Sequence, residues 1–141
     1  MHTIYRIIDA NLNRAREGLR VVEEVARFIL NDQVLTDSIK QLRHDLLQAE
    51  FSIPNASELL VKRNTDGDVG TELARDGQTP RVNLTDLVRA NLRRIQEAMR
   101  VLEEFGKLLS PEIGVSFKKI RYRCYTLEQT IINKLGGISR A

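Results

Sequence analysis

Cationic, acidic and glycine residues alternate in one short segment of the chain, residues 62–71. Its glycines permit a tight turn that presents backbone amides to an anion. Arg63 carries a planar fork of donors that matches a phosphate, and the oxygens of Asp66 and Asp68 are ligands that magnesium prefers. This combination is typical of phosphoryl transfer, although an ordinary solvated turn has a similar composition.

Four standard ligand motifs are absent from the sequence. A calcium-binding EF-hand loop fails because Val69 stands where glycine is needed and Arg75 where the bidentate glutamate belongs. Neither a Walker phosphate loop nor a dinucleotide-binding GxGxxG occurs. His44 has no cysteine or second histidine at metal spacing, so no zinc site is expected.

One sequence occurs twice in the chain. Residues 10–24 read ANLNRAREGLRVVEE and residues 90–104 read ANLRRIQEAMRVLEE, identical at nine of fifteen positions. The repeat continues at a shift of 78 residues: Ser38, Lys40 and Arg43 correspond to Ser116, Lys118 and Arg121. The repeated unit therefore extends beyond one helix.

Apolar residues at spacings of three and four predict two helices in each copy. We expect Asp9 to cap the first helix, whose apolar stripe consists of Ile8, Leu12, Ala15, Leu19, Val22, Ala26 and Ile29. The second helix, about 35–51, has its stripe at Ile39, Leu42, Leu46 and Leu47. In the second copy, Asn83 caps a helix over 84–109, and a last helix begins after Ser110 and ends at about 135, before Gly136 and Gly137.

These elements predict a single all-α domain over residues 1–141: repeat one at about 4–51, a long functional loop at 52–82 and repeat two at about 83–135. Neither helical hairpin can cover its own apolar stripe, so the two should pack together as a pseudo-twofold bundle of four main helices. A long coiled coil is less suitable, because the apolar spacing lasts only about three heptads.

Polar residues are copied with the apolar ones. Asn11, Arg14 and Glu17 return as Asn91, Arg94 and Glu97. Helical geometry places Asn11 and Arg14 at the margin of the apolar stripe, where a charge needs a partner, and Glu17 or Glu97 could supply it. Arg20 and Glu24, by contrast, have the spacing of a surface ion pair. Binding and structural roles both remain open for the Asn/Arg pairs.

Composition excludes several classes of protein. With 29% charged and 42% hydrophobic residues, and no long apolar run, the chain reads as a soluble domain with neither a membrane span nor a secretory signal, so we expect a cytoplasmic location. A net charge of +3, no Trp and 5% aromatic residues disfavour nucleic acid as a partner. The single cysteine, Cys124, is expected to serve as core packing.

The chain resembles the helical domain that precedes the barrel of long, fused thiamine-phosphate synthases and that also occurs alone, and the likeness covers nearly all 141 residues. It is carried by residues 7–20, by Lys40-Gln41-Leu42-Arg43-His44, by Gly67-Asp68-Val69-Gly70-Thr71 and by residues 97–107. This family is regarded as an alternative hydroxymethylpyrimidine phosphate kinase. The resemblance therefore implies ATP-dependent phosphorylation of 4-amino-5-hydroxymethyl-2-methylpyrimidine phosphate to the diphosphate, with Mg2+.

The resemblance also implies roles for residues. Arg63, Arg14 and Arg94 would bind phosphates, Asp66 and Asp68 would hold magnesium, and Asn11 or Asn91 would bind the aminopyrimidine or a phosphate. Glu17 or Glu97 would position the attacking oxygen. Further substrate contacts would come from the family motifs, at Arg43, His44, Gly67, Gly70 and Thr71.

Two other functions remain open. The first is a non-catalytic domain that binds the pyrimidine phosphate or assembles with thiamine-phosphate synthase. The second, a helical mutase with an arginine-lined pocket, rests on fold analogy alone. The partners expected are thus pyrimidine phosphate, nucleotide and the synthase, and the sequence leaves the oligomeric state open, a homo-oligomer included.

Overall fold

The computed structural model describes residues 2–73 and 80–140; residues 74–79, within the predicted loop and including Arg75, lie outside the described part. The described chain is all-helical and contains no strand, which confirms the predicted fold class. The four long helices are α1 (His2–Glu24), α2 (Gln33–Phe51), α4 (Leu84–Gly106) and α5 (Pro111–Arg140). Two short elements were not predicted: the π-helix η1 (Val25–Ile29), which continues α1, and α3 (Glu58–Lys62), inside the predicted loop.

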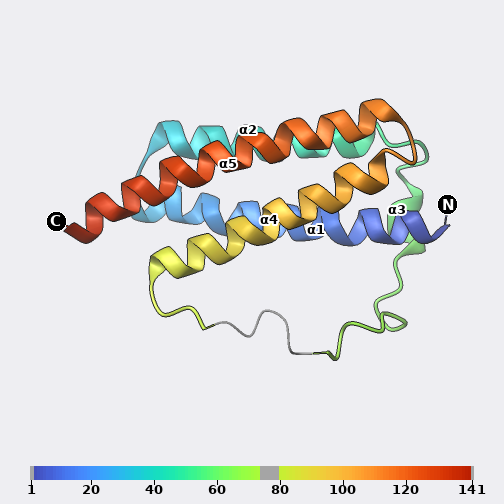
Figure 1. The fold of residues 1–141 in the computed structure, drawn as a ribbon, viewed down its shortest axis with the longest axis horizontal. Coiled ribbons are helices and arrows are strands. Elements are labelled where there is room, and N and C mark those ends of the chain that lie inside the picture. Colours follow the sequence, from blue (N-terminus) through green and yellow to red (C-terminus); the bar gives the residue numbers. More distant parts are fainter. Residues whose placement is uncertain (1, 74–79, 141) are drawn as a thin grey trace.

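The four long helices form a bundle (Figure 1). Helix α1 packs against α4, α4 against α5, and α2 against both α1 and α5, while the short α3 contacts α1. The two sequence copies therefore correspond to α1 with α2 and to α4 with α5. Their exact relation by a pseudo-twofold axis stays a prediction. None of the described helices has the length and apolarity that a membrane span requires.

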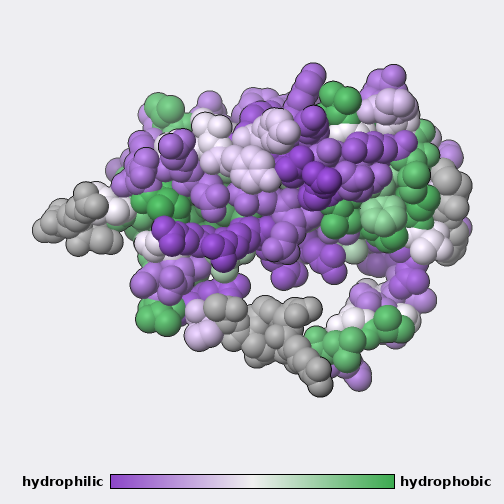
Figure 2. All heavy atoms as spheres, in the orientation of Figure 1, coloured by the Kyte–Doolittle hydropathy of each residue, from purple (hydrophilic) through white to green (hydrophobic). Residues whose placement is uncertain are grey.

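The predicted apolar stripes form the core, with two exceptions. The stripe of α1 is buried up to Ala26, but Ile29 is 51% exposed. Ile29 lies in the π-helix, whose wider turn rotates the residues that follow out of the α-helical phase. Leu47 is also largely exposed, because it stands one residue round the helix from the buried Leu46. Hydrophilic residues cover most of the face formed by α4 and α5 (Figure 2).

The helix ends follow the predicted capping residues only in part. Asn83 caps α4, since its side chain accepts a hydrogen bond from the amide of Asp86 at 2.8 Å. The cap predicted at Asp9 is wrong, because α1 begins at His2 and Asp9 lies in its interior. Gly136 and Gly137 do not end α5, which continues to Arg140; glycine lowers helix stability by about 1 kcal/mol without forbidding the conformation.

Candidate functional site

Arg63, predicted to bind phosphate, is paired with a buried carboxylate of α1. Its Nε and Nη2 atoms donate to Oδ2 and Oδ1 of Asp9, both at 2.8 Å. Hydrogen bonding to Asp9 and the negative charge of that carboxylate raise the pKa of the Arg63 guanidinium. This bidentate pair fixes the start of the loop on α1, so Arg63 is already neutralised before any ligand binds.

The glycine and aspartate residues of the loop hydrogen bond mainly with one another. The amide of Gly67 donates to Oδ1 of Asn64 at 2.9 Å, and that of Gly70 donates to Oδ1 of Asp68 at 2.8 Å. The hydroxyl of Thr71 donates to the carbonyl of Asp68. Two of the amides expected to face an anion therefore close turns within the loop.

A magnesium site was expected at Asp66 and Asp68. Both residues are exposed, and one oxygen of Asp68 already accepts the Gly70 amide. Within residues 2–73 and 80–140, no group of three or more His, Cys, Asp and Glu residues could hold a metal ion. Because magnesium commonly binds to only one or two carboxylates together with water and phosphate, the site at Asp66 and Asp68 stays a prediction.

The loop and the first turns of α1 enclose a small cavity of about 140 Å³, here called the loop pocket. Its polar lining comprises Arg6, Asp9, Asn13, Arg63, Asn64, Thr65 and Asp68. The structure thus brings Arg63 and Asp68 together, as the sequence predicted, but with α1 residues that the sequence analysis did not select. Arg6, Asp9 and Asn13 share one helical face at spacings of three and four, and this spacing was the available signal.

Arg6 is the cation of the loop pocket without a carboxylate partner. It donates one hydrogen bond, from Nη2 to the carbonyl oxygen of Asn64 at 3.3 Å, and forms no ion pair with any described residue. A guanidinium held by a neutral carbonyl keeps its charge and several donors available. Arg6 is therefore the group that an anion entering this pocket would meet.

The repeated Asn/Arg pairs lie elsewhere. The side-chain amide of Asn11 donates to the carbonyl of Ile7, and that of Asn91 to Leu87, both one turn earlier on the same helix. Arg14 donates to the side-chain oxygen of Asn11 at 3.3 Å, rather than pairing with Glu17.

The predicted residues do not share one cleft. Arg94, Glu17 and Glu97 are exposed and have no ion pair in the described part of the chain. Of the pockets found among the described residues, one between α4 and α5 includes Glu97, and the loop pocket includes Arg63 and Asp68. None of these pockets is lined by Asn11, Arg14, Asn91 or Arg94.

Arg43 has a structural partner. Its Nη1 donates to Oε1 of Glu23, a residue only 1% exposed, at 2.8 Å. The equivalent residue of the second copy, Arg121, donates from Nε and Nη2 to Oε1 of Glu103. Each pair joins the first helix of a copy to the second helix of that copy. His44, next to Arg43, is exposed.

Comparison with known proteins finds relatives that are longer than this chain. A thiamine-phosphate synthase from Nostoc sp. (strain PCC 7120) is 45% identical over 129 residues, which cover 92% of this chain and 35% of the relative. Those from Nostoc punctiforme and Rhodopirellula baltica are 46% and 43% identical, over 92% and 97% of this chain and 35% and 36% of their own lengths. The chain spans about a third of the proteins it matches. No solved structure matches it significantly.

These names correct one expectation from the sequence. The relatives are called synthases, so a kinase that uses ATP with magnesium is contradicted. The synthase names do not test whether Asp66 and Asp68 bind a metal ion.

The predicted resemblance to a domain of fused synthases is confirmed. The ThiD2 family model matches residues 6–130, from the start of the loop pocket in α1 through most of α5. The chain therefore belongs to the ThiD2 family.

Proposed function

We propose that this chain is a non-catalytic domain associated with thiamine-phosphate synthase, and that it binds the pyrimidine phosphate in the loop pocket. The observation that carries the proposal is the extent of the match: over nine-tenths of this chain corresponds to about a third of proteins named thiamine-phosphate synthase. A segment that covers a third of such a protein has the size of a separate domain beside the one that performs the synthesis.

The lining of the loop pocket suits such a ligand. Arg6 offers a charge and free donors to a phosphate. Asp68 uses one carboxylate oxygen for the Gly70 amide, which leaves the other to accept a hydrogen bond from an amino group such as that of an aminopyrimidine. The pocket has about 140 Å³, less than the roughly 300 Å³ at which sites for whole drug-sized ligands begin, so it would hold the phosphate with the ring at its mouth.

The proposal is tested by calorimetric titration of the protein with 4-amino-5-hydroxymethyl-2-methylpyrimidine phosphate. We expect saturable binding whose affinity is higher at low salt. Arg6→Gln should lower the affinity about tenfold, which is the contribution of one charge-assisted hydrogen bond. Arg89→Gln removes an equally positive, exposed side chain from α4 and should bind like the unmodified protein.

A second measurement addresses the association with the synthase. Sedimentation of the chain with a thiamine-phosphate synthase barrel, with and without the pyrimidine phosphate, should detect a complex. A complex without ligand binding would restrict the function to assembly. If neither ligand nor synthase binds, the proposal fails.

A further inference from the structure

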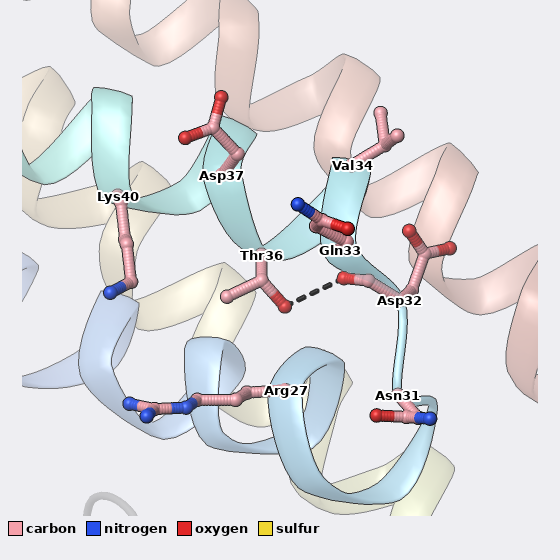
Figure 3. Close-up of a pocket in the computed structure, with 8 residues that line it drawn as sticks. All are labelled: Arg27, Asn31, Asp32, Gln33, Val34, Thr36, Asp37 and Lys40. Carbon is pink, nitrogen blue, oxygen red and sulfur yellow. Dashed lines mark hydrogen bonds between the residues drawn. The ribbon is translucent and has the colours of Figure 1, made fainter.

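A larger pocket lies at the other end of α1 from the loop pocket, and of the residues singled out in the sequence only Lys40 lines it. It has about 860 Å³ and lies between the π-helix η1 and the first turns of α2 (Figure 3). Arg27 stands about 27 Å along the helix from Asp9, at 1.5 Å per residue, so the two pockets are separate. Its volume is within the range of small-molecule sites.

Two cations from different elements line this pocket, here called the η1 pocket. Arg27 comes from η1 and Lys40 from α2, and the side chain of Lys40 extends toward η1 on the side where the guanidinium of Arg27 lies (Figure 3). Neither cation forms an ion pair with any residue that the structure describes. The guanidinium of Arg27 lies over the ring of Phe28, 4.9 Å from its centroid. Like charges on the same side of a pocket favour an anion between them.

The acidic residues of the η1 pocket do not neutralise these cations. Asp32 is engaged on the opposite side, where it binds Lys134 and caps α2 through the amide of Leu35. The carboxylate of Asp37 is directed away from Arg27 in Figure 3 and forms no ion pair within the described residues. The positive side of the pocket therefore remains open.

The sequence repeat supplies an internal comparison. Arg27 and Lys40 correspond to Lys107 and Lys118 in the second copy, at the shifts of 80 and 78 residues. There Lys107 is neutralised by Glu103 and Glu104, at 3.6 and 3.2 Å, and Lys118 lies over the ring of Tyr122. The cations were copied, but among the described residues only the first copy leaves both of them without an ion pair.

The π-helix explains the difference. In an α-helix Arg27 would lie one turn above Glu23, as Lys107 lies above Glu103. In η1 the amide of Leu30 donates to the carbonyl of Val25, five residues back, and the extra residue in the turn rotates Arg27 away from Glu23. Glu23 pairs with Arg43 instead, and Glu24 with Arg20. Such wide turns recur at functional sites.

We propose that the η1 pocket is a second, separate binding site for a phosphate group, held between Arg27 and Lys40. The phosphate is either free or carried by a small organic monoester. The polar groups of Asn31 and Thr36 line the same pocket and would contact the remainder of an ester. This site is independent of the loop pocket and of the proposed function.

The test titrates the protein with inorganic phosphate and with phenyl phosphate at low ionic strength, by calorimetry and by amide NMR. We expect saturable binding that shifts the amide signals of residues 31–40 and not those of residues 6–13. Arg27→Gln and Lys40→Gln should each weaken binding about tenfold, the value of one charge-assisted hydrogen bond. Tighter binding of phenyl phosphate would identify an ester as the ligand, and equal binding would identify the free ion.

Matched variants separate a site from a general charge effect. The double variant Lys107→Gln, Lys118→Gln removes the same charge from the equivalent positions of the second copy. It should change the affinity by no more than about twofold, because salt screens exposed charges that lie outside the η1 pocket. Arg6→Gln should also leave the phosphate affinity unchanged. A loop pocket that binds no ligand would therefore not affect the result for the η1 pocket. Absence of saturable binding, or equal losses in the Arg27/Lys40 and Lys107/Lys118 variants, would overturn the proposal.

Discussion

A β-carbon on Gly18 of α1 would lie 2.6 Å from Cγ1 of Ile95 in α4, and 3.3 Å from the carbonyl oxygen of Asn91. The first distance is far below van der Waals contact, so only a hydrogen atom fits between the two helices here. The second copy has Ala98 at the position equivalent to Gly18. The two copies thus meet through a contact that is not symmetric in sequence.

Gly18→Ala should destabilise the fold by about 1–3 kcal/mol, because overpacking outweighs the roughly 1 kcal/mol that alanine adds to helix stability. Urea unfolding followed by circular dichroism measures the change. Gly137→Ala is the control, since a β-carbon there meets nothing within 4 Å. Its stability should be unchanged or slightly higher. Equal stability of the two variants would contradict the close approach of α1 and α4.

Glu103→Ala should be more damaging than Glu104→Ala, although the residues are adjacent. Glu103 is buried and accepts two hydrogen bonds from Arg121, whereas Glu104 makes exposed ion pairs. Breaking the buried pair should cost about 3 kcal/mol, near the lower end of the usual range because Arg121 retains the hydroxyl of Tyr125. Loss of the exposed ion pairs in Glu104→Ala should cost about 0–1 kcal/mol of unfolding free energy. Denaturant midpoints of both variants test this difference.

Acid should weaken the fold through Glu103. Burial raises its pKa, but hydrogen bonds from Arg121 and the charges of Lys107 and Arg100 outweigh burial, so the pKa lies below its ordinary value of 4.5. A carboxyl with a lowered folded-state pKa stabilises the fold above pH 4.5, and this contribution is lost as the pH falls through the folded-state pKa. Unfolding free energies between about pH 7 and 3 should therefore decline in the acid range. Glu103→Gln should show a smaller decline, and an equal decline would refute the assignment.

Cys124 should react only after unfolding. Burial raises the pKa of its thiol to about 12, and the side chain is fully buried, so the thiolate that reacts with disulfide reagents is scarce and inaccessible. At pH 8 a chromogenic disulfide should label the native protein far more slowly than the protein in denaturant. Rapid labelling of the native protein would show that α5 opens easily around this residue.

Loss of the Arg63–Asp9 pair should release the loop. Arg63→Ala leaves Asp9, a residue only 7% exposed, without its partner, and the segment after α3 loses its ion pair with α1. Limited proteolysis within residues 64–73 should then be severalfold faster than in the unmodified protein. Arg89→Ala serves as the control. Asp9→Asn combined with Arg63→Gln should restore part of the protection, since the amides can pair without charge.

The helical class could be predicted from the sequence, because apolar spacing of three and four is a local property of each segment. The sequence also predicted the capping of α4 by Asn83, which depends on residues three apart, and the burial of most of the stripe from Ile8 to Ala26. These predictions succeeded because the interactions they describe are nearly all within one helix turn.

Spacing predicted the local ion pair of Arg20 with Glu24, but only the folded structure reveals the long-range partners of the charged residues. Asp9 was expected to cap a helix, but it meets Arg63, 54 positions away, once α3 folds against α1. Arg27 and Ile29 lie in the π-helix, whose wide turn changes the direction in which the side chains point relative to a regular α-helix. Spacing along the chain fixes which face a side chain occupies only while the turn is regular, and long-range packing decides which carboxylate a guanidinium reaches. The candidate sites depend on such long-range pairings. The sequence therefore predicted the fold better than it predicted the sites.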